Sequence, residues 1–413
     1  MAIEREDPQP SHQLAVEIGR DDANDPASAE EFDTSPEALH ALLELERSID
    51  HSVEAEIPPV KWASDAQQPD YAHSLAAERA GLDIDGTFTF DLNTFGLLAT
   101  ANHFRPAGDG SNVMFGLRGA VLTEGDDLQD RRAITLRDTR PDHAAFRCTL
   151  GIINLSSGRI DAFSGSTVPN RVWMRNYFRK RNNIQPFRRT NSNILPTGCY
   201  IYRVAGHSSN RIRPAMRMSN PDNLAQDGMC TVLRTYNDLV YSHNDFWDRT
   251  TPYDNIHCAY AYDSFSSAGC QTIKGPDGQG PWGRFQDMIG AFGYGKRLDY
   301  MLLTGRDASI ASAILKANRA GDAALVRTCL ERLRVGSQGD IVMKAQRKMG
   351  FNGTGYFGPV TKQRLTEYEK GAGLWSDGIL SPDDDARLDW GSFDPIRAPG
   401  LVPAPPSAFT VML

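Results

Sequence analysis

Short runs of apolar and β-branched residues alternate with turn residues through the middle of the chain. From residue 82 to residue 305 these runs are separated by Gly, Asn, Asp and Pro, which turns and loops favour. Runs with the length and composition of β-strands occur at residues 87–90, 112–116, 133–136, 146–154, 199–204 and 230–236. Short strands at such intervals are typical of mostly β folds, so the pattern predicts a mostly β domain over residues 82–305.

Helical spacing replaces the strand pattern after residue 305. Apolar side chains recur four positions apart in the pairs Ile310 and Ile314, and Val326 and Leu330. This spacing is typical of a helix with one buried face. It predicts a connecting helix over residues 306–330.

Residues 331–390 carry the pattern of three short helices. Pro359 stands where the second helix would begin, and proline is well tolerated in the first helical turn. Ser381 precedes Pro382 as a candidate N-cap of the third helix, followed by acidic residues that the helix dipole favours there. The expected fold class is therefore a mostly β domain with a small all-α three-helix domain after it.

Polar residues dominate both ends of the chain. Residues 1–80 hold 19 acidic and five basic side chains, whereas all 413 residues hold 52 acidic and 44 basic ones. We expect the acidic region 1–81 to be largely flexible, with a short helix at 36–48. Residues 391–413 are rich in proline, which favours an extended tail.

Composition and hydropathy exclude several classes of protein. A hydrophobic content of 40% with 36 Gly and 24 Pro is typical of a loop-rich globular chain and not of a coiled coil or a collagen. No run approaches the roughly 18 apolar residues of a membrane span. The first residues, MAIEREDPQP, lack the apolar core of a Sec signal peptide. We therefore expect synthesis in the cytoplasm, without Sec export and without a membrane span.

A basic segment lies behind the acidic start of the chain. Residues 162–221 contain 11 Arg or Lys and no Asp or Glu, with aromatic residues interleaved. A solvated surface is the simplest interpretation, and attraction of carboxylate-bearing substrates is the second. Nucleic-acid binding ranks last because no DNA- or RNA-binding motif accompanies the charges. We therefore predict no nucleic-acid partner.

The six cysteines form no CxxC pair, which argues against a structural zinc site and predicts free thiols. No metal and no organic cofactor is expected. Four of the cysteines have the surroundings of small buried apolar residues: Cys148, Cys199, Cys230 and Cys329.

Cys270 has different surroundings, because it follows a turn of small residues at 266–269. Such a turn exposes a thiol together with backbone N–H groups, here those of Gly269 and Cys270, which acyl transfer needs as an oxyanion hole. His257 stands 13 positions upstream. If two strands flank the intervening loop, His257 lies beside the thiol, favours the thiolate and moves the proton.

These residues resemble the L,D-transpeptidase (YkuD-like) catalytic domain, whose signature is a His-Gly on one strand and a Ser-His-Gly-Cys after a loop. The resemblance implies Cys270 as nucleophile and His257 as base, with Ser267 and Gly269 matching the motif. Ala268 and Cys258 replace the family's second His and first Gly.

The same resemblance implies substrate contacts elsewhere in the domain. The run LPTGCY looks like a substrate-side strand of the family, which points to Thr197 and Gly198. His207 follows that strand, and Gln271 follows the nucleophile; both are candidates for substrate binding.

Residues 331–390 resemble the peptidoglycan-binding domain-like module. The match rests on glycines and turns in the family's order: Gly336, Gly339-Asp340, Gly355-Tyr356-Phe357-Gly358-Pro359, Asp377-Gly378-Ile379 and Pro382. The resemblance implies that this segment binds the glycan of peptidoglycan and so holds the protein near the bacterial cell wall.

Together these resemblances imply a cysteine enzyme that acts on peptidoglycan stem peptides through a thioester. Transfer to an amine, as in an L,D-transpeptidase, and hydrolysis, as in an L,D-carboxypeptidase or amidase, remain equally open. The enzyme would act in the periplasm or cell wall after non-classical delivery, with the N-terminal region docking to a secretion or phage apparatus. The alternative is a non-catalytic peptidoglycan-binding structural or apparatus protein with a decayed motif.

Overall fold

The computed structural model describes residues 59–62, 74–84, 86–106, 112–174, 192–207, 212–221, 223, 225–234, 239–241 and 245–393. The helix expected at 36–48, most of the acidic region 1–81 and the tail from residue 394 lie outside these residues. So do the arginines and aromatic residues between positions 175 and 191 of the basic segment.

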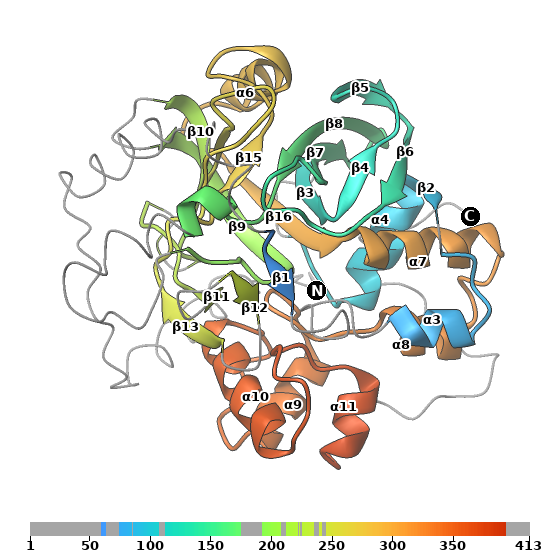
Figure 1. The fold of residues 1–413 in the computed structure, drawn as a ribbon. Coiled ribbons are helices and arrows are strands. Elements are labelled where there is room, and N and C mark those ends of the chain that lie inside the picture. Colours follow the sequence, from blue (N-terminus) through green and yellow to red (C-terminus); the bar gives the residue numbers. More distant parts are fainter. Residues whose placement is uncertain are drawn as a thin grey trace, which may run out of the picture.

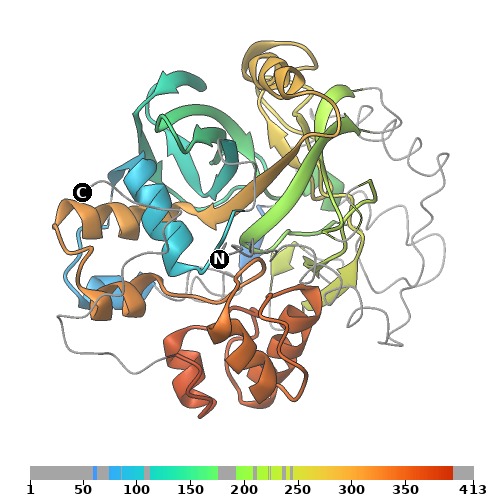
Figure 2. The ribbon, with the colours of Figure 1, turned by 180° about the vertical axis from the view of Figure 1, so that it is seen from behind.

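Eight strands close into a β-barrel at the centre of the molecule (Figures 1 and 2). Around the barrel they follow the order β15 (Gln271–Ile273), β14 (Ile256–Cys258), β10 (Ile212–Met218), β9 (Gly198–His207), β16 (Arg297–Thr304), β3 (Asn112–Arg118), β7 (Cys148–Asn154) and β8 (Arg159–Ser166). Pairing of β15 with β8 closes the ring, and β5 (Asp127–Arg131) extends it from β8.

Three small sheets accompany the barrel. They are β2 (Thr87–Asp91) with β6 (Ala133–Asp138) and β4 (Ala120–Leu122), β11 (Cys230–Arg234) with β13 (Phe246–Thr250), and β1 (Lys61–Trp62) with β12 (Val240–Tyr241). Each of the six strand runs expected from the sequence coincides with an observed strand. The prediction of a mostly β fold is confirmed.

Strand residues alternate between the barrel interior and its outer wall. On β16, Tyr300 and Leu302 pack in the cluster that fills the barrel, whereas Met301 and Leu303 pack with the helices outside. Helix α6 (Gly280–Phe292) packs against β8, β9 and β10 and buries Phe285 in the interior cluster. The interior is therefore a packed core.

Four helices cover one side of the outer wall: α3 (Ser74–Arg79), α4 (Leu92–Ala101), α7 (Gly305–Lys316) and α8 (Ala323–Leu330). The prediction of one helix over 306–330 is wrong, because α7 and α8 are separate. The chain leaves α7 through Asn318, which has a left-handed φ of 53°. It restarts at Asp322, whose side chain caps α8 by accepting from the backbone N–H of Leu325 at 3.0 Å.

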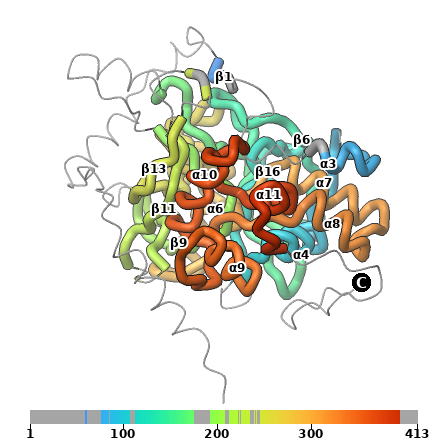
Figure 3. Tube along the Cα trace, turned by 90° about the horizontal axis from the view of Figure 1, so that it is seen from below, coloured from blue at the N-terminus to red at the C-terminus, as the bar shows by residue number. Residues whose placement is uncertain are grey.

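Residues 331–393 contain α9 (Asp340–Lys348), α10 (Pro359–Gly371) and α11 (Pro382–Arg387). Figure 3 shows α10 beside β11 and β13. At this junction Thr231 donates to the carbonyl oxygen of Pro359 at 3.0 Å, and Trp247 Nε1 donates to that of Ser376 at 2.7 Å. Leu365 of α10 belongs to the same hydrophobic cluster as the barrel interior. The C-terminal helices are therefore docked on the β structure.

No helix in the part of the chain that the structure describes is long and apolar enough to cross a membrane.

Candidate active site

His257 lies on β14, and Cys270 directly precedes β15, the strand that pairs with β14 in parallel. The register sets Ile256 opposite Gln271. The backbone N–H of Gln271 also donates to the carbonyl oxygen of Asn255 at 2.8 Å, so Asn255 lies next to Cys270. Because side chains alternate along a strand and neighbours in register share a face, Asn255, His257 and Cys270 point to the same side.

That side is the outer wall of the barrel. The alternate residues of the two strands, Ile256, Cys258 and Ile273, lie in the interior cluster. Gln271 also points inward, since it is fully buried and its Oε1 accepts from the Tyr300 hydroxyl at 3.4 Å. The structure thus places this side chain inside the barrel, and its expected role in substrate binding stays a prediction.

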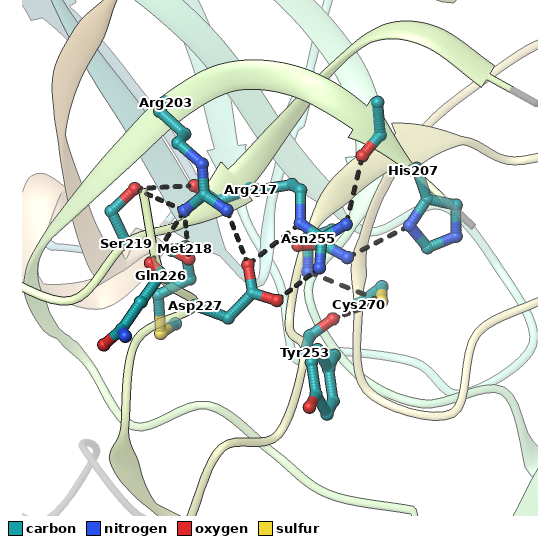
Figure 4. Close-up of polar contacts among 11 residues, drawn as sticks. Arg203, His207, Arg217, Met218, Ser219, Gln226, Asp227, Tyr253, Asn255 and Cys270 are labelled. Atoms are coloured by element: carbon teal, nitrogen blue, oxygen red, sulfur yellow. Dashed lines mark hydrogen bonds and ion pairs between the residues drawn. The ribbon is translucent and has the colours of Figure 1, made fainter. Parts of the chain in front are cut away.

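The Cys270 thiol lies between two backbone groups (Figure 4). It donates to the carbonyl oxygen of Tyr253 at 3.3 Å, and its sulfur accepts from the N–H of Asn255 at 3.5 Å. Tyr253 has a left-handed φ of 56°, which is uncommon for a bulky residue. The N–H at the sulfur favours the thiolate, and the carbonyl acceptor favours the protonated thiol. Cys270 is partly exposed, as a nucleophile requires.

Two buried histidines stack beside this thiol. The rings of His207 and His257 are 4.2 Å apart between centroids, with 13° between their planes. His257 Nδ1 donates to the carbonyl oxygen of Cys258 at 2.7 Å, which leaves Nε2 as the basic atom of the neutral ring. His207 Nδ1 is 3.1 Å from the Asn255 amide nitrogen and accepts from it, so its proton resides on Nε2. The two rings therefore hold opposite tautomers.

Ser267 and Gly269 shape the turn that presents the thiol. Ser267 Oγ donates to the carbonyl oxygen of Cys270 at 2.7 Å and accepts from the N–H of Gly269 at 3.0 Å. Since the Gly269 N–H is used within the turn, the structure does not present it as an oxyanion donor. The backbone N–H of Asn255 is the donor that the structure directs at the sulfur.

Gly198 begins β9, with Thr197 directly before it, and His207 ends the strand. Thr197 Oγ1 accepts from Arg334 at 2.8 Å. A Cβ on Gly198 would lie 2.6 Å from the carbonyl oxygen of Val335. Both residues therefore pack against the chain that enters the C-terminal helices, and their expected substrate contacts stay predictions.

The other cysteines have surroundings that do not favour a thiolate. Cys148, Cys230 and Cys329 are buried, and burial raises the pKa of each thiol. Burial also raises the pKa of Cys199 well above its usual value, and Cys258 lies in the interior cluster. Among the described residues, no group of three or more His, Cys, Asp or Glu side chains is placed to hold a metal ion.

Asp254 is a residue of this site that the sequence did not single out. Its carboxyl is buried, and burial raises its pKa to about 7, opposed by the charges of Arg234 and Arg118. The Asn193 amide, in the orientation that satisfies both groups, donates to its two oxygens at 2.9 and 3.1 Å. The sequence feature that could have pointed to Asp254 is the polar pair at 254–255, which comes directly before a buried strand.

Asn193 joins the two turns that hold the thiol. Its backbone N–H donates to the carbonyl oxygen of Ala268 at 2.8 Å, while its side chain bonds Asp254. A Cβ on Gly269 would lie 2.6 Å from the Asn193 side chain, so any larger residue there would displace the Asn193 amide.

Comparison with known proteins gave no match, whether with family models, with curated proteins or with solved structures.

Proposed function

We propose that this protein is a cysteine enzyme that acts on peptidoglycan stem peptides through a thioester, as an L,D-transpeptidase or an L,D-carboxypeptidase or amidase. The observation that carries the proposal is the partly exposed Cys270 thiol, with a backbone N–H at its sulfur and two stacked histidines on the same face. The substrate class rests on the resemblances in the sequence.

Each group has one step in this proposal. His257 is the diagonal neighbour of Cys270 across the paired segments, and its Nε2 takes the thiol proton. The thiolate attacks a peptide carbonyl, and the C–N bond breaks as the amine leaves with the proton from His257. The thioester that remains is then attacked by water or by a second amine, the C–S bond breaks, and the thiol is regenerated.

Peptidoglycan is thus both the substrate and the binding partner in this proposal. Residues 331–393 would contribute glycan contacts from the exposed surface of α9–α11, because their inner surface is used in packing on the β structure. The reaction would take place in the periplasm or cell wall.

Purified muropeptides test the proposal, with the masses of the products as readout. Loss of a C-terminal amino acid by hydrolysis supports a carboxypeptidase, internal hydrolysis an amidase, and cross-linked dimers a transpeptidase. The Cys270→Ala variant should give none of these. If the wild-type protein binds sacculi but changes no muropeptide, the alternative stands, which is a non-catalytic wall-binding or apparatus protein.

A further inference from the structure

A row of polar side chains crosses the outer wall of the barrel towards Cys270. Strand pairing sets Arg297 of β16 opposite Arg203 of β9, and Arg203 opposite Arg217 of β10. Their neighbours in sequence, Tyr202 and Leu298, lie in the interior cluster, so these arginines face outward.

The row continues to the nucleophile. Met216 of β10 is opposite Ile256 of β14 in an antiparallel pair, which sets Arg217 next to Asn255. Asn255 is in turn next to Cys270. Neighbouring strands are about 4.8 Å apart, so the Arg217 and Cys270 backbones are separated by about 10 Å. The Arg217 guanidinium contacts Asp227 and the carbonyl oxygen of Gly206, and the next residue, His207, bonds the Asn255 side chain.

One carboxylate holds the two inner arginines in place (Figure 4). Asp227 accepts from Arg203 Nη2 at 2.8 Å, from Arg217 Nε at 2.9 Å and, through its second oxygen, from Arg217 Nη2. Arg203 also donates to the Ser219 hydroxyl at 2.9 Å and to the carbonyl oxygen of Gln226 at 2.8 Å. Arg203 and Arg217 therefore share the carboxylate of Asp227.

Arg217 is the arginine nearer the thiol, and its guanidinium is only partly committed. Its Nη1 makes a long contact of 3.4 Å with the carbonyl oxygen of Gly206, beside His207. The side chain is 21% exposed. A guanidinium held on one edge by Asp227 has its orientation fixed and can still offer N–H groups to a second anion.

We propose that Arg217 binds a carboxylate of the substrate and thereby sets which bond reaches Cys270. The identity of that bond rests on the proposed function. In a peptide, the terminal carboxylate lies about one residue, ~3.8 Å, beyond the last amide carbonyl. A carboxylate held by Arg217 towards Asn255 therefore places that carbonyl at the thiol. The site selects peptides in which the scissile bond is next to a free carboxylate.

Alkylation of Cys270 tests the carboxylate site without a substrate. Iodoacetate carries a carboxylate and iodoacetamide is its neutral analogue; both transfer a carbon to the sulfur and release iodide. The rate of each at Cys270 is measured by mass spectrometry of the peptide that contains it. Arg217→Gln should lower the ratio of the iodoacetate rate to the iodoacetamide rate on the order of fivefold, as expected for one charge at this distance. An unchanged ratio in folded Arg217→Gln overturns the proposal.

Arg297→Gln is the matched control, since it removes the same charge from the same row four strands from Cys270. At about 19 Å that charge is screened at physiological ionic strength, and the ratio should stay within about twofold of wild type. An equal fall in both variants would show a diffuse field and overturn a site at Arg217. Should Arg217→Gln fail to fold, the wild-type ratio decides: it should fall as salt rises from about 0.01 M to about 1 M. A salt-independent ratio overturns the proposal.

Peptide binding separates this inference from the proposed function. The Cys270→Ala variant should bind a stem peptide with a free C-terminus about tenfold more tightly than the same peptide as its amide, which corresponds to one charge-assisted hydrogen bond. Equal affinities contradict the carboxylate site. If the alkylation ratio behaves as expected but wild type changes no muropeptide, the site stands and the proposed function falls. If wild type turns over acid and amide peptides equally, the proposed function stands and the carboxylate site falls.

Discussion

At the scale of single residues, the six cysteines show how surroundings decide chemistry. Cys148 and Cys230 carry the same thiol group as Cys270, but both are buried, and burial raises the pKa of each. Cys270 is partly exposed and receives a backbone N–H. The difference comes from the backbone at Tyr253 and Asn255, which brings one acceptor and one donor to the sulfur.

Substitution of the two proposed reacting groups should remove turnover. Cys270→Ser should lose nearly all muropeptide turnover, because a serine hydroxyl is not ionised near neutral pH. His257→Ala removes the proton carrier, a step that contributes about 10² to 10⁴ in rate. The double variant should be little worse than the worse single one, since the two act as a unit.

Cys258→Ala is the matched control for these variants. Its side chain adjoins His257 in sequence but faces the interior cluster, so turnover should change little once folding is verified by circular dichroism. Wild-type turnover in folded Cys270→Ser, or its loss in Cys258→Ala alone, would contradict the mechanism.

The buried carboxyl of Asp254 should make stability depend on pH. Its pKa is about 7 in the folded protein against an ordinary value of 3.8, so between these values the folded state binds the extra proton. Stability therefore falls as pH rises through that window, by up to about 4 kcal/mol from this group. Asp254→Asn should remove this group's share of the fall and leave the share of Glu369, whose pKa burial also raises.

Urea denaturation of wild type and Asp254→Asn between about pH 4 and pH 8 measures this effect. The exposed Asp83, whose side chain is 77% accessible, provides the control Asp83→Asn. That variant should keep the wild-type slope. Parallel profiles for wild type and Asp254→Asn would show that the carboxyl does not hold the extra proton.

The sequence predicted part of this site and missed the rest for a physical reason. The spacing of His257 and Cys270 indicated two strands around a loop, and the structure has them on paired strands. Gln271 was expected to contact the substrate, whereas its side chain points into the barrel. Thr197 was expected to contact the substrate, and in the structure its hydroxyl accepts from Arg334. The face of the sheet on which a side chain lies, and the direction in which its strand runs, depend on tertiary pairing, which local sequence does not specify.

At the scale of elements, the turn over residues 267–270 controls the position of the thiol. Gly269→Ala should disturb this turn, because a Cβ would lie 2.6 Å from the Asn193 side chain. The contact is relieved by moving the Asn193 side-chain amide, which bonds Asp254. We expect a loss of muropeptide turnover of tenfold or more, with a decrease in stability of about 1–3 kcal/mol.

Gly371→Ala is a control for this prediction, since a Cβ there meets no atom within 4 Å and the residue ends a helix. It should leave turnover unchanged. A Gly269→Ala variant with normal turnover and a normal melting temperature would mean that the turn tolerates a side chain.

Helices and strands were predictable where the local composition favours the structure that the segment adopts in the fold. The strand runs at 112–116 and 146–154 are β-rich and became β3 and β7. The break between α7 and α8 was missed, although Asn318 and Asp322 are residues that end and begin helices. Helix α6 was also missed, because glycine and proline at its start resemble a loop in sequence.

At the scale of the whole molecule, closure of the barrel brings distant segments together. Thr272 of β15 pairs with Ser166 of β8, and Tyr300 of β16 pairs with Met114 of β3. These pairs are far apart in sequence, so no local pattern predicts them. The resemblance of residues 331–390 to an appended module likewise gave no sign that Leu365 shares a cluster with the barrel.

This shared cluster predicts one cooperative unfolding transition. Leu365 of α10 is fully buried, and Leu365→Ala should lower the free energy of unfolding by about 2–5 kcal/mol. Because α10 packs on β11 and β13, the loss should reach the β structure. Hydrogen exchange should therefore show reduced protection of β11 and β13 together with α10, and near-ultraviolet circular dichroism should follow a single transition.

Arg364→Ala is the neighbouring control, because Arg364 is exposed and pairs with the exposed Glu367 in the same helix. It should cost less than about 1 kcal/mol. If Leu365→Ala melts α9–α11 in a separate early transition while the exchange of β11 and β13 keeps its wild-type protection, the C-terminal helices are an independent unit. In that case their removal would test glycan binding directly. If the transition is single, removal of residues 331–413 would remove side chains of the shared hydrophobic core and destabilise the β structure. Wall binding then has to be tested with surface substitutions on α9–α11.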